Sequence, residues 1–231
     1  MTSGTWQARR TQIETYFDRT ASETWKRLTS DAPVSGIRAT VRAGRDAMRG
    51  TLLSWLPADM RGLRLLDAGC GTGALSVEAA KRGASVVAID VSRSLVQVAR
   101  ERSAGTPGEI RFEVGDMLDP YLGEFDHVVA MDSLIHYRAP DAVRALAGLA
   151  ARTRSSILFT FAPRTPLLSA MHTVGRIFPR GDRAPAIEPV GEAALRRLIE
   201  RDAGLAGFAP RHSKRIASGF YTSQAMELLA R

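Results

Sequence analysis

Short apolar segments alternate with segments of helical spacing through the middle of the chain. Five apolar segments of strand length predict β-strands over 63–67, 85–90, 110–114, 125–130 and 156–161. Helices are predicted between them over 74–82, after Ser92 and around 143–150. Strands that alternate with helices in this way predict βαβ units, a parallel sheet and the α/β fold class.

The patterns differ toward the two ends of the chain. Ile13, Tyr16 and Phe17 follow the i, i+3, i+4 spacing of an amphipathic helix, and a second helix is predicted over 37–54. Near the other end the pattern predicts a helix over 191–203 and a closing strand pair within 208–229, the first strand over 214–217 and the second from 219 onward. We therefore separate an N-terminal helical arm or lid, 1–50, from a main domain, 51–231.

One segment within the main domain breaks the alternation of strands and helices. Residues 162–190 contain five prolines and four arginines, yet they also carry large apolar residues such as Leu167, Met171 and Phe178. Because a linker does not need apolar side chains of this kind, we interpret 162–190 as an insertion rather than a linker.

Composition limits the classes of protein to which the chain belongs. With 231 residues, 45% hydrophobic and 24% charged, it is predicted to fold around one core. No apolar run reaches the roughly 20 residues of a membrane span, and we expect no secretory signal and a cytoplasmic location. Cys70 is the single cysteine, which excludes an internal disulfide and a four-cysteine zinc site.

The charge is strongly positive. The net charge is +8, and 29 of the 32 basic residues are Arg. Such a surplus indicates an anionic partner, which can be a nucleic acid, a membrane surface or a small molecule. The preference for Arg over Lys is equally well explained by the coding preference of the source.

The most informative motif is LLDAGCGTG at 65–73, where a predicted strand enters a glycine loop and a helix follows. Glycines let the backbone turn sharply and approach a ligand closely, and the helix start offers N–H groups that have no partner within the helix. Gly69, Gly71 and Ala74 also satisfy the loose fingerprint of dinucleotide-binding folds, so the loop alone does not identify the ligand.

Three carboxylates narrow the choice of ligand. Asp67 precedes the loop, where it would repel a pyrophosphate but attract an ammonium or sulfonium. Asp90 ends the second strand and can accept the two hydroxyls of a ribose. Asp116 can accept from the amine of an adenine, with Met117 packed on the ring. A ligand with ribose, adenine and an amino acid but no phosphate is S-adenosylmethionine.

These motifs resemble the class I S-adenosylmethionine-dependent methyltransferases, through the loop at 65–73, Asp90, GDM at 115–117 and FDHVVAMDSLIHY at 125–137. The resemblance implies a Rossmann-like, doubly wound, seven-stranded and mostly parallel sheet with a C-terminal antiparallel hairpin. The cofactor-binding residues that it implies are Asp67, Gly69, Cys70, Gly71, Asp90, Asp116, Met117 and Met131.

The flanking segments are similar to the magnesium-protoporphyrin IX O-methyltransferases of chlorophyll and bacteriochlorophyll biosynthesis. The matching segments are YF at 16–17, WKRL at 25–28, VSGIR at 34–38, MDSLIHY at 131–137, FAPRTPLL at 161–168 and SGFY at 218–221. The resemblance implies methyl transfer from S-adenosylmethionine to a propionate of magnesium-protoporphyrin IX, with S-adenosylhomocysteine as the second product.

The same resemblance implies that His136 and Tyr16 are the catalytic pair. An ordinary structural histidine and a packing tyrosine are the competing interpretations. Arg is the better partner for a propionate because its fork bonds both oxygens. With the resemblance, 162–190 is expected to be a substrate-binding insertion. The candidate substrate-binding residues are Arg164, Arg38, Trp25 and Met171, with Arg176 as a further candidate anion partner.

Partners and alternatives complete the expectations. The four histidines and Cys70 show no ligand spacing, so we expect no protein-bound metal. The resemblance suggests contact with magnesium chelatase and a peripheral contact with the photosynthetic membrane, whereas an aromatic content of 6% argues against nucleic acid. Three alternatives stay open: a methyltransferase for a quinone or small acid, an RNA methyltransferase, and a non-catalytic binding module.

Overall fold

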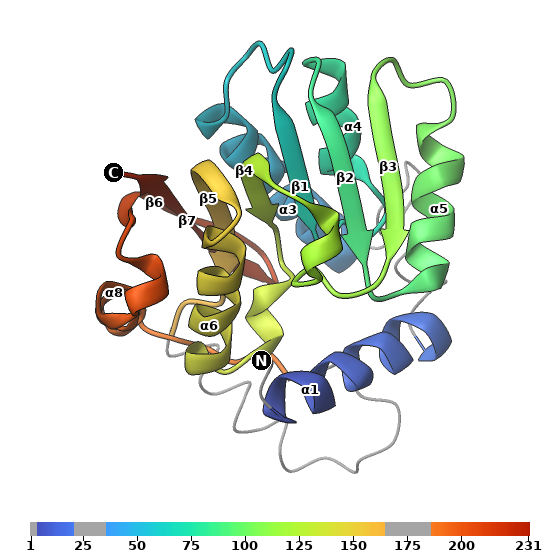
Figure 1. The fold of residues 1–231 in the computed structure, drawn as a ribbon. Coiled ribbons are helices and arrows are strands. Elements are labelled where there is room, and N and C mark those ends of the chain that lie inside the picture. The colour runs from blue at the N-terminus through green and yellow to red at the C-terminus, as the bar shows by residue number, and fades with distance from the viewer. Residues whose placement is uncertain (1–3, 21–35, 165–185) are drawn as a thin grey trace.

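A single seven-stranded sheet forms the centre of the protein (Figure 1). The computed structural model describes residues 4–20, 36–164 and 186–231. The strand order is β3-β2-β1-β4-β5-β7-β6, with β1 to β5 parallel, β7 antiparallel to β5, and β6 antiparallel to β7. The strands are β1 (Arg64–Ala68), β2 (Ser85–Asp90), β3 (Glu109–Val114), β4 (Phe125–Ala130), β5 (Thr153–Phe161), β6 (Phe208–Ser218) and β7 (Tyr221–Ala230). The predicted α/β sheet with its antiparallel C-terminal hairpin is confirmed.

The helices follow the predicted alternation. The α-helices are α1 (Gly4–Thr15), α3 (Gly36–Trp55), α4 (Ala74–Lys81), α5 (Arg93–Ser103), α6 (Ala139–Ala150) and α8 (Glu192–Arg201). Shorter turns are the π-helical η1 (Tyr16–Thr20) and the 3-10 turns η2 (Pro120–Leu122), η3 (Leu134–His136) and η4 (Ala203–Leu205). Ser92 caps α5 as predicted, because its hydroxyl accepts from the Leu95 N–H at 3.2 Å. None of the described helices is long and apolar enough to cross a bilayer.

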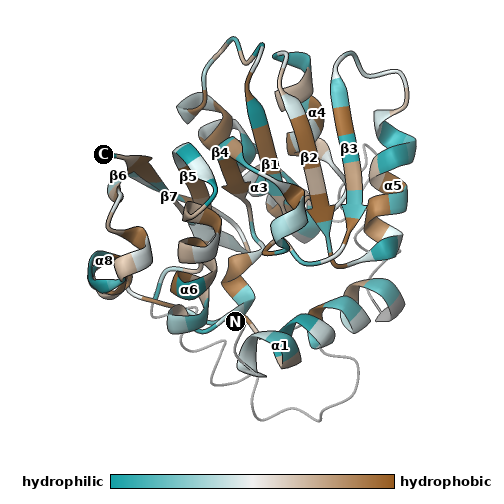
Figure 2. Cartoon of the chain, in the orientation of Figure 1, coloured by the Kyte–Doolittle hydropathy of each residue, from teal (hydrophilic) through white to brown (hydrophobic). Residues whose placement is uncertain are grey.

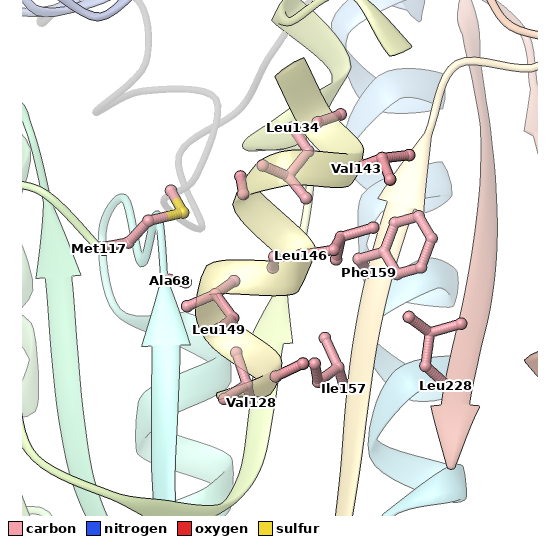
Figure 3. Close-up of a cluster of buried hydrophobic side chains, with 14 of the residues drawn as sticks. Ala68, Met117, Val128, Leu134, Val143, Leu146, Leu149, Ile157, Phe159 and Leu228 are labelled. Carbon is pink, nitrogen blue, oxygen red and sulfur yellow. The ribbon is translucent and has the colours of Figure 1, made fainter. Parts of the chain in front are cut away.

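Two hydrophobic layers hold the helices on the sheet. On one face, Leu146 and Leu149 of α6 lie against Val128, Ile157 and Phe159 of the strands (Figure 3). On the other face, α3 and α4 pack on the strand residues of opposite parity, such as Leu65 and Leu158. The edge strand β3 instead alternates hydrophilic and hydrophobic residues (Figure 2). The helices on the two faces of the sheet thus bury both sides of the central strands, as parallel sheets require.

Helix α1 lies across the carboxyl-end side of the sheet (Figure 1). The Trp6 ring stacks on Tyr137 with a centroid distance of 4.0 Å, and Ile13 is buried. Thr5 donates to Asp141 at 3.0 Å, so the start of the helix is also tied to α6. The predicted helix through Ile13, Tyr16 and Phe17 is interrupted, because α1 ends at Thr15 and a π-helical turn follows.

The predicted strand pair at the C-terminal end is confirmed, but the starts of its two strands need correction. Strand β6 begins at residue 208, well before the predicted 214, and β7 begins at Tyr221 rather than at 219. Gly219 has a φ of +56° and lies in the turn between the two strands. The early part of β6 was missed because it contains Pro210, exposed Arg211 and a register shift between Pro210 and Ser213.

The domain boundaries stay a prediction. Helix α3 runs continuously through residue 50, so the arm and the main domain share one helix. The ends of the predicted insertion meet: Pro163 pairs with Val190, and the Arg164 N–H donates to the Val190 carbonyl at 3.0 Å. A segment whose two ends pair with each other in this way is more typical of an insertion than of a linker.

Candidate functional site

The glycine loop has the geometry of a ligand cradle. Gly69 has a φ of +88°, and a Cβ on it would lie 2.4 Å from the Cβ of Ser133. Gly71 has a φ of +53°, and a Cβ there would meet no described atom within 4 Å. The first glycine is therefore required by close packing, while the second opens its backbone toward empty space that a ligand can fill.

A pocket opens beside this loop at the carboxyl ends of the strands. Six of the predicted site residues line it: Gly69, Gly71, Asp90, Met117, Met131 and His136. The other lining residues are Ile13, Phe17, Arg45, Ile89, Val91, Leu95, Gly115, Asp132, Ser133 and Tyr137. Cofactors of open α/β sheets bind at this position, outside the carboxyl ends of the strands.

Asp90 is fixed at the pocket wall by the backbone. Its carboxylate accepts from the Gly71 N–H and from the Ser92 N–H, both at 2.9 Å. Desolvation raises the pKa of Asp90, and the two backbone donors oppose that rise. The carboxylate thus faces the pocket with a fixed orientation, as the predicted ribose contact needs.

Asp67 is buried behind the loop and does not line the pocket. It is 2% exposed and accepts from the Ser76 hydroxyl at 2.6 Å. Burial, with a smaller contribution from the negative charge of Asp90, raises the pKa of Asp67 to about 7. Neighbouring Cys70 also lies outside the pocket lining and packs against the cluster around α3 and α4.

Asp116 is engaged with α1. Its Oδ2 accepts from Trp6 Nε1 at 3.3 Å and lies 3.6 Å from the Arg10 guanidinium, while its Oδ1 accepts from the Leu118 N–H at 2.9 Å. The adjacent Met117 lines the pocket and Asp116 does not. The adenine contact predicted for Asp116 stays a prediction. The contacts with Trp6 and Arg10 show that this carboxylate holds α1.

His136 and the residues after α1 form one aromatic wall. The His136 ring, in η3, lies 6.4 Å from the Phe17 ring by centroid, and both side chains line the pocket. Tyr16 packs edge-on to Phe17 at 5.2 Å and is half-buried, and burial raises the pKa of its phenol. The structure therefore places His136 in the pocket lining. Tyr16 does not line the pocket but contacts Phe17, which does.

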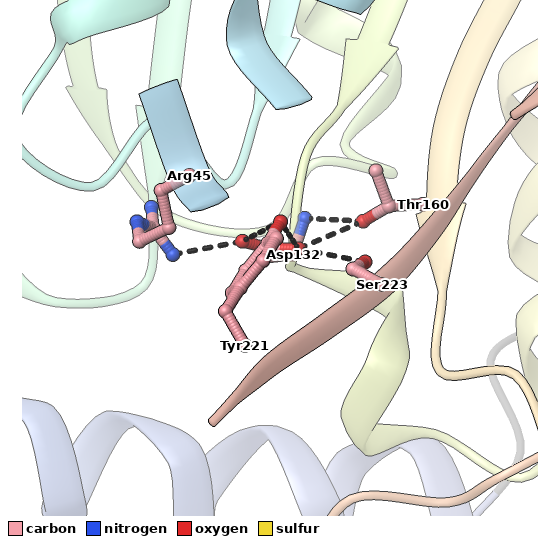
Figure 4. A network of polar contacts seen from close by, with 5 residues as sticks. All are labelled: Arg45, Asp132, Thr160, Tyr221 and Ser223. Carbon is pink, nitrogen blue, oxygen red and sulfur yellow. Dashed lines mark hydrogen bonds and ion pairs between the residues drawn. The ribbon is translucent and has the colours of Figure 1, made fainter. Parts of the chain in front are cut away.

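Sequence reasoning missed an ion pair at the pocket. Arg45 of α3 donates through one guanidinium nitrogen to Asp132 Oδ2 at 2.8 Å, and both residues line the pocket (Figure 4). Arg45 is one of four arginines on α3, and nothing in the spacing distinguishes it from Arg38 or Arg49. Asp132 lies within the 125–137 motif, just after the end of β4, and this position was the available signal.

The predicted substrate-binding residues are not gathered at the described pocket. Arg38 lies exposed on α3 and Arg164 lies exposed after β5, and neither lines the pocket. Trp25 and Met171, like Arg176, lie outside the described residues. Among the described residues no three His, Cys, Asp or Glu side chains gather as metal ligands, and the expected lack of a bound metal stays a prediction.

The residues at the pocket fit S-adenosylmethionine. Asp90 supplies acceptors for ribose, and Ile89, Leu95 and Met117 supply an apolar wall for adenine. The Ser133 hydroxyl is buried beside Gly69 and has no hydrogen-bond partner among the described residues, so a polar ligand group would satisfy it. Arg45 supplies a cation for the carboxylate of an amino acid.

Comparison with family models gives two matches. The model for the magnesium-protoporphyrin IX methyltransferase C-terminus matches residues 130–230. A methyltransferase-domain model matches residues 65–156, which include the glycine loop.

Individual relatives agree with these matches. The chain is 50% identical over 220 residues to a magnesium-protoporphyrin O-methyltransferase of Rhodobacter capsulatus, covering 94% of this chain and 95% of the relative. The crystal structure of magnesium protoporphyrin IX methyltransferase from Synechocystis PCC 6803 with bound S-adenosylhomocysteine superposes with a TM-score of 0.83 at 27% identity, covering 96% of this chain and 99% of that one. A ubiquinone biosynthesis O-methyltransferase of Xanthomonas oryzae is 33% identical but covers only 62% of this chain and 64% of its own length.

Proposed function

The chain belongs to the magnesium-protoporphyrin O-methyltransferase family, and we propose that it methylates one propionate of magnesium-protoporphyrin IX with S-adenosylmethionine as donor. The observation that carries the proposal is 50% identity over nearly the full length of both chains, joined to a pocket that fits the cofactor. The quinone alternative is weaker because that similarity leaves more than a third of the chain unmatched.

The pocket suggests how the cofactor is held. Asp90 and Met117 line the pocket. Asp90 would receive the ribose hydroxyls, and Met117 would pack on the adenine. Arg45 lines the same pocket beside Asp132, and its guanidinium would suit the α-carboxylate of the methionine part. Met131 lines the pocket next to Asp132, at the end of β4.

The reaction requires little chemistry from the protein. The bound cofactor supplies an electrophilic methyl group on a sulfonium. A propionate is ionised at pH 7, so its oxygen could attack the methyl carbon in line without a general base. The new O–C bond would form as the S–C bond of the sulfonium breaks, and S-adenosylhomocysteine would leave. The protein contributes proximity, alignment and exclusion of water, with the reacting atoms about 3–3.5 Å apart.

His136 and Tyr16 are proposed to orient this reaction. His136 lies on the pocket wall and can donate a hydrogen bond to the incoming carboxylate. Tyr16 keeps its phenol protonated because burial raises its pKa, so it can act as a donor when the arm is closed. Phe17 lies between the two side chains and lines the pocket.

The macrocycle is proposed to lie between the arm and the 162–190 insertion. Trp25 and Met171 would contact its flat apolar face, and Arg38 and Arg164 would attract its carboxylates. The positive net charge supports this assignment, as do the exposed positions of both arginines at the carboxyl-end side of the fold.

A turnover assay tests the function. Purified chain, S-adenosylmethionine and magnesium-protoporphyrin IX should yield monomethyl ester by chromatography, with metal-free protoporphyrin and a catechol quinone precursor as competing acceptors. His136→Gln should lower kcat by about 10- to 100-fold through misalignment. The matched control is His212→Gln, because His212 pairs with Glu227 on the hairpin and lies outside the pocket lining.

The outcomes of the assay separate the candidates. Ester formed from the magnesium porphyrin, with His212→Gln unaffected, supports the proposal. Methylation of the catechol alone would overturn it in favour of the quinone reaction. Equal loss of kcat in both histidine variants would remove His136 from the proposed catalytic pair.

Contacts with an anionic membrane surface and with magnesium chelatase are also proposed. Exposed Arg38 on α3 and exposed Arg211, Lys214 and Arg215 on β6 provide cationic groups for either partner. Retention on phosphatidylglycerol vesicles that falls as salt rises tests the membrane contact, and co-purification with chelatase tests the second.

A further inference from the structure

A cluster of hydroxyl groups surrounds the Asp132 carboxylate. The Tyr221 hydroxyl donates to it at 3.2 Å, Ser223 Oγ donates to Oδ1 at 3.2 Å, and Thr160 Oγ1 donates to Oδ1 at 3.1 Å. Figure 4 shows the cluster, with Tyr221 and Ser223 on β7, Thr160 on β5 and Arg45 approaching from α3. Four donors from three elements thus meet on one carboxylate.

The number of donors decides what Asp132 can do. An ionised carboxylate offers about four acceptor positions, and the three hydroxyls and Arg45 occupy that number. The Tyr221 hydroxyl remains a donor at neutral pH, because burial and the neighbouring charge of Asp132 raise its pKa. Asp132 therefore has little capacity to bind the cofactor itself, although it lines the pocket.

The backbone of Asp132 is equally constrained. Its φ is +54°, a value that few residues other than glycine adopt and that Asp and Asn tolerate best. Its N–H donates to Thr160 Oγ1 at 2.7 Å, which holds this conformation against β5. The carboxylate is consequently aimed at α3, where Arg45 meets it with only 21% of its side chain exposed.

We propose that Asp132 is a positioning residue, held by Tyr221, Ser223 and Thr160, that fixes the Arg45 guanidinium for the amino-acid carboxylate of the cofactor. This inference rests on the proposed function of the pocket and adds a role for the C-terminal hairpin. A guanidinium carries five N–H donors and can bridge two carboxylates, which are here those of Asp132 and the cofactor. The hairpin thereby contributes to cofactor affinity without touching the cofactor.

Binding of two ligands tests the role of Asp132. S-adenosylhomocysteine carries the amino-acid group, and 5′-methylthioadenosine has the same adenine, ribose and thioether without it. Asp132→Asn keeps the shape and the tolerance for positive φ but removes the charge, and should raise the Kd for S-adenosylhomocysteine by about tenfold. The Kd for 5′-methylthioadenosine should change by less than about twofold, since it makes no contact with Arg45.

Tyr221→Phe is the second variant and decides the question if Asp132→Asn does not fold. It should raise the ratio of the two Kd values in the same direction, by about threefold. Tyr121→Phe is the matched control, because Tyr121 is 60% exposed in η2 and lies outside the pocket lining. Thermal melting confirms that each variant is folded.

The outcomes distinguish this proposal from the proposed function. A Kd ratio unchanged in the variants, or equal weakening of both ligands, overturns the positioning role even where the wild type forms ester. A selective loss of S-adenosylhomocysteine binding supports it even where no porphyrin is methylated. A wild type that binds neither ligand overturns both proposals.

Discussion

The Asp67 carboxyl lies beneath the glycine loop, where burial raises its pKa to about 7 and Ser76 is its hydrogen-bond donor. Asp67 does not line the pocket, but it lies behind the glycine loop, so a sulfonium and an ammonium bound in the pocket would still favour its ionised form electrostatically. The affinity for S-adenosylmethionine should therefore rise as the pH increases from 6 to 8, by up to about tenfold per pH unit below the pKa. Calorimetric titration at several pH values measures this dependence.

Asp67→Asn provides the control for this prediction. The folded pKa of Asp67 lies above its ordinary value of 3.8, so its contribution to stability is complete below pH 4 and is lost as the pH rises through 7. The variant lacks the buried charge, so at pH 8 it should melt higher than the wild type while binding the cofactor more weakly. A variant that keeps the pH dependence of binding would show that another group is responsible.

The sequence could predict some residues of the site but not others. Gly69, Gly71 and Asp90 could be predicted because their contacts are local, between one strand end and the next. Arg45 and Asp132 are 87 residues apart, and their pairing depends on how α3 docks on the hairpin, which no local spacing records. The contact of Asp116 with Trp6, 110 residues away, likewise has no local signal in the sequence.

At the scale of elements, α1 is attached to the main domain by side chains at its start and middle. Thr5 bonds Asp141, Trp6 bonds Asp116, and Arg9 pairs with Glu188 at 3.1 Å. Its second half contributes Ile13, which lines the pocket. Few contacts hold the helix compared with the strands beneath it, so it belongs to the segments that can open locally.

Trp6→Ala should release α1 without unfolding the sheet. The variant loses the stack on Tyr137 and the hydrogen bond to Asp116, so amide exchange in 4–15 should accelerate by at least about tenfold, equivalent to about 1.4 kcal/mol. Trp6→Phe keeps a ring for stacking and should lie between the two. Amide exchange followed by mass spectrometry measures both, with β1 and β4 as internal references that should not change.

A different result would revise the role of α1. If exchange in 4–15 is unaffected by Trp6→Ala, the tie to Asp141 and the pair with Glu188 hold the helix alone. If exchange accelerates equally in the sheet, Trp6 is part of the global core rather than an attachment point.

Element prediction succeeded where burial is uniform and failed where it alternates with charge. Strands β1, β2, β4 and β5 are apolar runs because both faces of the sheet are covered, and their predicted positions were within three residues. Strand β6 was predicted only over 214–217, because its first part carries Pro210, exposed Arg211 and a register shift and contains no apolar run.

On the scale of the whole molecule, binding of the cofactor should stabilise the fold. The pocket is lined by residues of α1, α3, β2 and α5 and by the loops that follow β1 and β4, so a ligand there contacts elements from both hydrophobic layers. S-adenosylhomocysteine at about 100 times its Kd should stabilise the fold by about 2.7 kcal/mol, and the melting temperature should rise by about 5–10 °C. Differential scanning calorimetry with increasing ligand measures the shift, and a melting temperature independent of ligand would contradict it.

The sheet ends at β6, and the residues of this edge strand affect whether copies of the protein aggregate when they are concentrated. An unpaired strand edge is a template on which another chain can add a strand and begin a fibre. In β6, Pro210 removes a donor, the register shift twists the edge, and Arg211, Lys214 and Arg215 would meet their own copies with like charge. Pro210 and the register shift hid the first part of this strand from the sequence analysis, and they also hinder one copy from adding a strand to the next.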